Sequence, residues 1–426
     1  MVGSLNARKF QRREHTVLCE AESQQSLDGM KAWITVSHPS LSCHGMIGDI
    51  IRLRTLQRAV EHEGWRTRMI TTAEHCQQTL LSQPQNETES RRRIKDALKR
   101  GAPKFVWSTL KDLSYRRLNH RFYELLESQP DRPDLIVDYN FYFNDAALRF
   151  ARKHGIPVHL NFEGFIPDSM ADVPRSFLRT IGHRFELNKY SAVDAIWTVS
   201  QPLEMELRRL LGSAAPAIHV IPNAMDPPDR IDGSLRKEFG LEEKTVVGFV
   251  GGLSPWFSLD RLLEACNRLR YDNPKLHLVL VGDGPERNRL EQQIEQLDAH
   301  TWCTLVGQVC HEEVPRHIAC FDVAVVTNHK WWTSPLKLLE YGAVGMPVVA
   351  PDLPSITSIV ADDEAVIFRR DDFKDFEEKL KTLIDLGAKR RDLGKRLQRR
   401  VVAEYSTAAM RSRIREALSG ESTVRR

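Results

Sequence analysis

The feature that most constrains the fold is an alternation of short β-branched apolar segments with segments of helical periodicity, which occurs twice along the chain. Strands are predicted in the first series at 31–38, 66–72, 133–139, 156–161, 195–200 and 219–221. Strands are predicted in the second series at 246–250, 276–281, 304–306, 323–326 and 347–350. Because such alternation builds right-handed βαβ units, the sequence predicts an α/β protein with two doubly wound parallel sheets.

The length of the chain supports two domains. Its 426 residues exceed the roughly 250 to 300 residues at which a single core stops growing. A polar basic segment, 1–30, precedes the first strand, and a Pro/Asp-rich stretch follows the sixth. We therefore place a flexible tail at 1–30, a first domain at 31–228 and a second at 229–405.

Composition excludes several classes of protein. With 41% hydrophobic and 28% charged residues, the chain is predicted to be globular, neither disordered nor stapled by disulfides. No apolar run approaches the roughly 18 residues of a membrane span, and the first thirty residues contain no signal-like core. The net charge of +4 gives no indication of nucleic-acid binding. Seven cysteines without a Cys-x-x-Cys pair are expected of a cytoplasmic protein.

Two further features have an ordinary interpretation that we prefer. Cys310, His311, His317 and Cys320 do not have the spacing of a standard zinc module, so no metal site is predicted. The polar stretch 74–129 contains a cationic helical segment that could contact an anionic membrane. A solvated helical face explains it more simply, and membrane contact is the less favoured alternative.

Loops that follow strands are where doubly wound sheets bind ligands. Gly251, Gly252 and Ser254 follow one strand of the second series, and Gly282 follows the next. Glycines there allow backbone amides to approach an anion, although tight turns also use glycine for steric reasons.

A third loop carries charged residues at a helix start. Ser334 is predicted to be the N-cap, with Pro335 and Leu336 in the first turn, so that helix amides face a phosphate. Lys337 adds a positive charge, and Glu340, three residues further along the same face, could bind a pair of sugar hydroxyls. The alternative is an amphipathic helix with a surface Lys–Glu pair.

In combination, these loops resemble the family-four retaining glycosyltransferases. The resemblance rests on segments at 250–253, 280–285, 305–315, 321–323, 334–341 and 345–350, together with His44-Gly45 and 221–226 in the first half. It implies the GT-B fold, in which two Rossmann-like domains face a central cleft. It also implies donor binding on the second domain, acceptor binding on the first, and a last segment, 406–426, that crosses back to the first domain.

The same resemblance implies particular residue roles. Glu340 matches the second glutamate of the family's Glu-(seven residues)-Glu motif and is expected to contact the donor ribose. The first glutamate is replaced by Trp332, and no cation follows the glycine loop. Lys337 is therefore the main candidate to neutralise the diphosphate, assisted by Arg261 or Lys330. Neither a bound metal nor a cofactor is expected; the nucleotide diphosphate sugar is a co-substrate.

In the first domain, Gly45 is expected where the backbone approaches the donor, and His44 is a candidate polar contact. Glu163 could bind an acceptor hydroxyl or act as a base, and a loop carboxylate without a role is the alternative. The aromatic run 139–143 fits sugar stacking and the core equally well. Trp331 and Trp332 lie in a polar loop, and we interpret them as a sugar or acceptor platform.

These features favour a cytoplasmic, metal-independent transferase that moves a hexose from a nucleotide diphosphate sugar, UDP-linked in preference to GDP-linked. The acceptor would be a hydroxyl of a small molecule, a glycan or a lipid-linked compound, and no nucleic acid is involved. One alternative is an epimerase of the nucleotide sugar on the same fold. A second is a degenerate homologue that binds the nucleotide sugar without catalysis.

Overall fold

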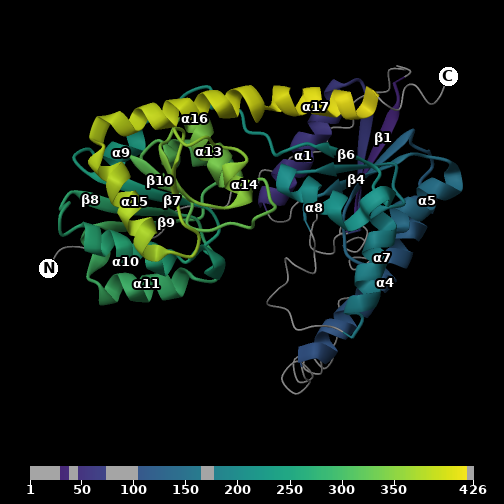
Figure 1. The fold of residues 1–426 in the computed structure, drawn as a ribbon, viewed down its shortest axis with the longest axis horizontal. Helices are drawn as coiled ribbons and strands as arrows, with labels where there is room; N and C mark the ends of the chain where they lie inside the picture. Colours follow the sequence, from purple (N-terminus) through teal and green to yellow (C-terminus); the bar gives the residue numbers. More distant parts are fainter. Residues whose placement is uncertain (1–28, 38–46, 73–103, 165–176, 420–426) are drawn as a thin grey trace, which may run out of the picture.

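The computed structural model describes residues 29–37, 47–72, 104–164 and 177–419 (Figure 1). They form two six-stranded sheets, and every strand pairs in parallel with its neighbours. The prediction of two doubly wound parallel sheets is confirmed. The predicted positions His44 and Gly45 and the cationic segment 91–100 lie outside the described residues.

The first sheet has the strand order β2-β1-β3-β4-β5-β6. Its strands are β1 (Lys31–Val36), β2 (Arg66–Thr71), β3 (Leu135–Tyr139), β4 (Val158–Phe162), β5 (Ala195–Thr198) and β6 (Ala217–Val220). The second sheet has the order β12-β11-β10-β7-β8-β9. Its strands are β7 (Thr245–Val250), β8 (Leu276–Val281), β9 (Cys303–Gly307), β10 (Val323–Val325), β11 (Val348–Pro351) and β12 (Val366–Phe368).

Helices cover both faces of the first sheet. They are α1 (Ile47–His62), α4 (Lys104–Glu127), α5 (Ala146–His154), α7 (Arg179–Tyr190), α8 (Gln201–Leu211) and α17 (Thr407–Ser419). Strand β1 shows how the two faces are divided, because side chains alternate along a strand. Trp33 packs into the core under α4, α5, α7 and α8, whereas Ala32 and Ile34 pack into the core under α1 and α17.

The second sheet is covered in the same way. Its helices are α9 (Ser234–Glu238), α10 (Leu259–Leu269), α11 (Arg287–Gln296), α12 (Val314–Ile318), α13 (Leu336–Val344), α14 (Pro354–Thr357), α15 (Phe373–Asp385) and α16 (Arg390–Glu404). Two separate apolar cores lie on the two faces, with Val246 in one and Val247 in the other. The strands of this sheet are apolar at consecutive positions because both faces are buried.

Helices α16 and α17 follow each other and connect the two halves of the molecule, as the yellow ribbon in Figure 1 shows. Met410 and Ile414 of α17 are buried in the first domain's core against α1. Arg415 also forms an ion pair with Glu63, at 2.7 Å between Nε and Oε2. The last helix is therefore part of the first domain's core.

In both sheets the strand order reverses direction at one point. The reversal lies between β1 and β3 in the first sheet and between β7 and β10 in the second. A crevice forms outside the carboxyl ends of the strands at such a reversal, and ligands bind there in doubly wound folds. The residues that follow β7 and β10 are therefore the first place to look for a site.

Candidate functional site

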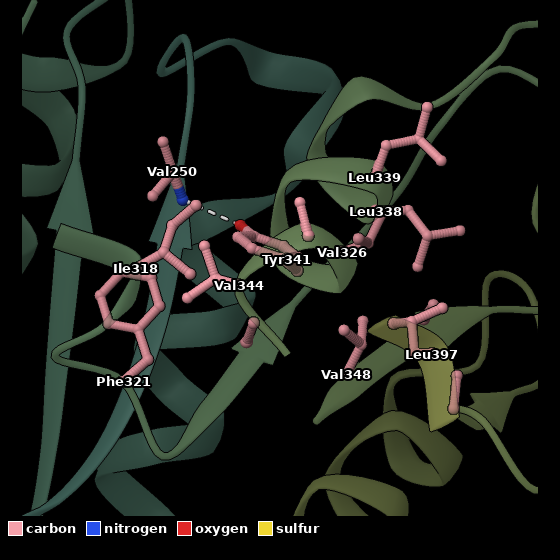
Figure 2. Packing of buried hydrophobic residues seen from close by; sticks show 14 of the residues in the cluster. Val250, Ile318, Phe321, Val326, Leu338, Leu339, Tyr341, Val344, Val348 and Leu397 are labelled. Atoms are coloured by element: carbon pink, nitrogen blue, oxygen red, sulfur yellow. Dashed lines mark hydrogen bonds between the residues drawn. The ribbon is translucent and has the colours of Figure 1, made fainter. Parts of the chain in front are cut away.

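Helix α13 is fixed to the reversal point of the second sheet by Tyr341. The phenol is fully buried, and its oxygen accepts a hydrogen bond from the Val250 amide at 3.0 Å, as Figure 2 shows. The same hydroxyl lies 3.5 Å from the Val325 carbonyl oxygen of β10. Apolar side chains including Ile318 and Val344 surround this contact. One side chain thus ties the helix to both strands that flank the crevice.

Lys337 projects from the first turn of α13 towards the end of β7. Its Nζ lies 4.0 Å from the ring centroid of Phe257 and 5.3 Å from that of Phe249. A methyl group at Gly251 would come within 2.6 Å of this Nζ, so the ammonium lies against the glycine loop. Burial lowers the pKa of Lys337, because desolvation disfavours the charged form.

Glu340 lies one turn further along α13 and is also partly buried. Burial raises its pKa, while the positive charge of Lys337 opposes that rise. In the described part of the chain, no ion pair within 4.0 Å joins Glu340 to Lys337 or to any other cation. The two partly buried charges attract each other but form no salt bridge, so the alternative of a surface Lys–Glu ion pair is wrong.

The glycines after β7 and β8 have a steric reason to be glycine. Gly251 and Gly282 have φ angles of 137° and 135°, in the region that disfavours side chains. A methyl group at Gly282 would lie 2.0 Å from the Gly251 carbonyl oxygen. The Gly251 amide donates to the Val281 carbonyl oxygen at 2.9 Å, so it is already used within the sheet. Gly252 is exposed beside this turn, and the Ser254 amide donates to its carbonyl oxygen at 3.0 Å.

Ser334 is not the N-cap of α13, and that prediction is wrong. The cap position is Pro335, which has extended backbone angles, and Leu336 begins the helix. The Ser334 hydroxyl accepts instead from the Asn223 amide at 3.1 Å, and its carbonyl oxygen accepts from Asn223 Nδ2 at 2.9 Å. Ser334 therefore connects the start of α13 to the segment that follows the first sheet.

Trp332 is not an exposed sugar platform, which corrects a second prediction. Its side chain is 8% exposed and belongs to the first domain's core, and Trp331 packs partly buried beside it. A methyl group at Gly164 would lie 2.2 Å from the Trp332 Nε1, so the indole fills the space that this glycine leaves. The Ser200 hydroxyl donates to the Trp332 carbonyl oxygen at 2.5 Å. The residue in place of the family's first glutamate thus joins the two domains.

Glu163 lies next to that contact, after β4, and is held by several partners. Its carboxylate accepts from the Tyr139 hydroxyl at 2.9 Å and from Asn161 Nδ2 at 3.2 Å, and it forms an ion pair with Arg52. These contacts fix the orientation of the carboxylate. A carboxylate held by a cation and two donors is suited to positioning.

The aromatic run after β3 belongs to the core. Phe141, Tyr142 and Phe143 are each at most 6% exposed, and they pack with Tyr115 of α4. Of the two interpretations of this run, core packing is therefore the right one, and sugar stacking at these three rings is excluded.

Sequence reasoning missed His329, which follows β10 at the reversal point. Its Nδ1 lies 2.6 Å from the Thr333 hydroxyl, and burial together with the charge of Lys337 lowers its pKa to about 4. The imidazole is therefore neutral at physiological pH. Of the two predicted assistants of Lys337, Arg261 stacks on Phe373 at 5.3 Å, whereas Lys330 lies over the Trp332 ring at 5.7 Å and its charge acts on His329 together with that of Lys337.

Two members of the Cys/His set of the second domain, His317 and Cys320, are part of the protein framework. Cys320 is buried, with its thiol donating to the Arg316 carbonyl oxygen at 3.6 Å, and His317 Nδ1 lies 2.8 Å from the Glu313 carbonyl oxygen. Within the described ranges no cluster of three or more His, Cys, Asp or Glu side chains has metal-binding geometry. Within the same ranges, no helix is long and apolar enough to span a bilayer.

Comparison with known proteins defines the class. Two family models match in succession, "Glycosyl transferase 4-like domain" over residues 50–224 and "Glycosyl transferases group 1" over residues 233–400. With the two parallel sheets and their reversal points, these matches define a GT-B fold with two Rossmann-like domains. The chain thus carries a glycosyl transferase 4-like domain followed by a glycosyl transferases group 1 domain.

Individual relatives are more distant. An exopolysaccharide phosphotransferase of Streptomyces coelicolor is 31% identical over 162 residues, which are 38% of this chain and 16% of the relative. A D-inositol 3-phosphate glycosyltransferase of Stackebrandtia nassauensis is 28% identical over 275 residues, 59% of this chain and 60% of the relative. The matches thus span less than two thirds of either relative. The crystal structure of Anabaena HepE in complex with UDP shares the fold, with a TM-score of 0.66 and 16% identity over 92% of this chain and 100% of that one.

Proposed function

We propose that this protein is a retaining glycosyltransferase that moves a hexose from a nucleotide diphosphate sugar to a hydroxyl acceptor. The observation that carries the proposal is the position of Lys337. Its ammonium is partly buried at the reversal point of the second sheet, and no carboxylate within 4.0 Å neutralises it among the described residues. Because burial disfavours an unpaired cation, an anion in the crevice would complete the site. A diphosphate at this position fits that requirement.

The reaction breaks the bond between the anomeric carbon and the diphosphate oxygen and forms a bond from that carbon to the acceptor oxygen. The acceptor's proton passes to the departing diphosphate on the same face of the sugar, so no enzymic nucleophile is required. Lys337 would stabilise the negative charge that develops on the leaving group. Glu340, on the same face of α13, would accept hydrogen bonds from the donor ribose.

The first domain would supply the acceptor side of the cleft. Glu163 is oriented by Arg52 and Tyr139 beside the interdomain contact of Trp332. We propose that it positions the acceptor hydroxyl. The nucleotide is proposed to be UDP in preference to GDP, in part because HepE, which has the same fold, is known with UDP.

Thermal unfolding with UDP, GDP, ADP and dTDP, each with and without magnesium, tests the proposal. One nucleotide should stabilise the protein without magnesium, by about 2.7 kcal/mol at one hundred times its dissociation constant. The stabilisation should fall to roughly half or less in Lys337→Met and remain in Lys237→Met, which removes the charge of an exposed lysine from α9. If none of the nucleotides stabilises the protein, the proposal fails.

A second experiment tests catalysis. Incubation with the stabilising nucleotide sugar and a panel of hydroxyl acceptors should release the nucleoside diphosphate, and the product's anomeric configuration by NMR should match the donor's. Inverted configuration would contradict the proposal. Conversion of the nucleotide sugar to an epimer without acceptor would support the epimerase alternative instead.

A further inference from the structure

Five large apolar side chains are exposed in the first half of α4, just before α7 and in the first turn of α7. They are Phe105, Leu110, Leu113, Phe177 and Ile181, with exposures between 40% and 74%. They make up five of the thirteen large apolar side chains that are exposed in the described ranges. We name this set the α4–α7 patch. Single exposed apolar residues are ordinary, but a cluster on two neighbouring helices indicates an interaction surface.

The patch is continuous between the two helices. The rings of Phe105 and Phe177 meet edge to face, with centroids 4.9 Å apart, and the Phe177 amide donates to the Thr109 hydroxyl at 3.2 Å. Figure 1 shows α4 extending away from the first sheet. The exposed ring at the start of α4 and the exposed ring before α7 therefore form one apolar surface.

Helical geometry shows that Leu110 and Leu113 are not needed for the core. Ser108, Asp112 and Tyr115 are buried and define the inner face of α4. With 100° per residue, Leu110 and Leu113 lie on the opposite face. Among the residues that the structure describes, no core packing explains two leucines there.

Positive charge surrounds the patch. The segments 105–121 and 177–184 contain six lysine and arginine residues, namely Lys111, Arg116, Arg117, Arg121, Arg179 and Arg184. Asp112 is their only acidic residue and is buried, whereas the whole chain has 61 basic and 57 acidic residues. In the described ranges none of the six cations has a carboxylate within 4.0 Å. The local surface is therefore strongly cationic in a chain that is close to neutral.

The buried residues beside the patch anchor α4 and the segment before α7 to the first domain. Tyr115 of α4 and Leu178, which precedes α7, pack on Phe141 and Phe143. These two rings follow the carboxyl end of β3, the edge of the sheet at which ligands bind in this fold.

We infer that the α4–α7 patch docks on the surface of an anionic lipid bilayer. Leucine, phenylalanine and isoleucine side chains surrounded by lysine and arginine match the two layers of such a surface, acyl chains below and acidic headgroups above. The excess of positive charge opposes pairing with a second copy of the same patch. This inference goes beyond the proposed transfer reaction and does not depend on it.

Co-sedimentation of the full chain with vesicles tests the inference without any nucleotide sugar. Vesicles of phosphatidylcholine with about one third phosphatidylglycerol should bind the protein at ~0.1 M salt, and vesicles of phosphatidylcholine alone should bind it at least about tenfold more weakly. Leu110→Ser combined with Ile181→Ser should weaken binding by about tenfold or more, because two apolar side chains no longer insert among the acyl chains and the attraction to the anionic headgroups carries more of the binding. Arg117→Gln combined with Arg184→Gln should do the same and reduce the dependence on salt.

Matched variants elsewhere serve as controls. Met205→Ser with Ile231→Ser removes two equally exposed apolar side chains, and Arg391→Gln with Arg399→Gln removes two exposed cations from α16. Both pairs should bind like the wild type, and thermal unfolding should show that all variants are folded. Absence of binding to anionic vesicles, or equal losses in the controls, would overturn the inference. So would a dimer in light scattering that the Leu110 and Ile181 changes dissociate, because the patch would then be a contact between copies.

Discussion

Replacing Lys337 with methionine separates ligand binding from stability. Methionine keeps an unbranched chain against Phe257 but has no charge. A hydrogen bond to a charged group contributes about 1.5 to 3 kcal/mol, so affinity for the nucleoside diphosphate should fall roughly 10- to 150-fold. The free protein should lose little, because the lost cation–π attraction is offset by the lost cost of burying the ammonium. Its free energy of unfolding should stay within about 1 kcal/mol of the wild-type value.

Isothermal titration calorimetry at pH 7 without magnesium measures the affinity, and urea unfolding measures the stability. Lys237→Met is the matched control, since it removes the charge of an exposed lysine from α9. Its affinity should stay within about twofold of the wild-type value. If Lys337→Met binds within twofold of the wild type, or if both variants lose affinity equally, Lys337 does not contact the diphosphate.

Three more outcomes follow from the same contacts. Burial lowers the pKa of Lys337 below its ordinary value of 10.5. Diphosphate affinity should therefore be full at pH 7 and should fall as the pH is raised from 7 towards 10.5, because the ammonium loses its proton. A constant affinity in calorimetry between these two pH values would contradict the assignment. Tyr341→Phe leaves the buried Val250 amide without its acceptor and should cost about 1 to 3 kcal/mol in urea unfolding, an unchanged midpoint being the contrary result. Gly164→Ala places a methyl group against the Trp332 indole, at a residue whose backbone φ is 150°. The melting temperature should fall by several degrees, at about 2 to 4 °C for each kcal/mol of lost stability. An unaltered melting curve would show that the indole does not pack against Gly164.

The sheets could be predicted because their signal is local. A strand buried on both faces is a short apolar run wherever it lies, so segments such as 246–250 and 276–281 could be located from the sequence alone. Strand β12 and helices α7, α8, α9, α14, α15 and α16 were not predicted. Helix α7 buries Glu186 and Lys189 as an ion pair at 2.8 Å, so its inner face contains charged residues where periodicity requires apolar ones.

The errors at the site have a different cause, namely contacts between residues far apart in the chain. Ser334 has the local signature of an N-cap, but its hydroxyl is used by Asn223, 111 residues away. Trp332 lies in a polar loop, yet a space beside Gly164 accommodates its ring. A single sequence contains no information about partners that come from the other domain. The place of Lys337 in the first turn of α13 could be predicted, with an error of one residue in the helix start, because helical periodicity is a local property.

The segment from Trp332 to Glu340 has two attachments, and this explains how the first glutamate of the family motif could be replaced. Trp332 and Ser334 are held by the first domain, through Ser200 and Asn223, whereas Tyr341 holds α13 to the second sheet. The start of α13 is thus fixed from both sides before any ligand binds, and the ammonium of Lys337 is oriented in advance. A pre-oriented cation stabilises a leaving group without reorganisation during the reaction. We propose that Trp332 replaces a direct contact to the donor sugar with this fixed geometry. Trp332→Glu should then weaken nucleotide binding, even though it restores the family's residue.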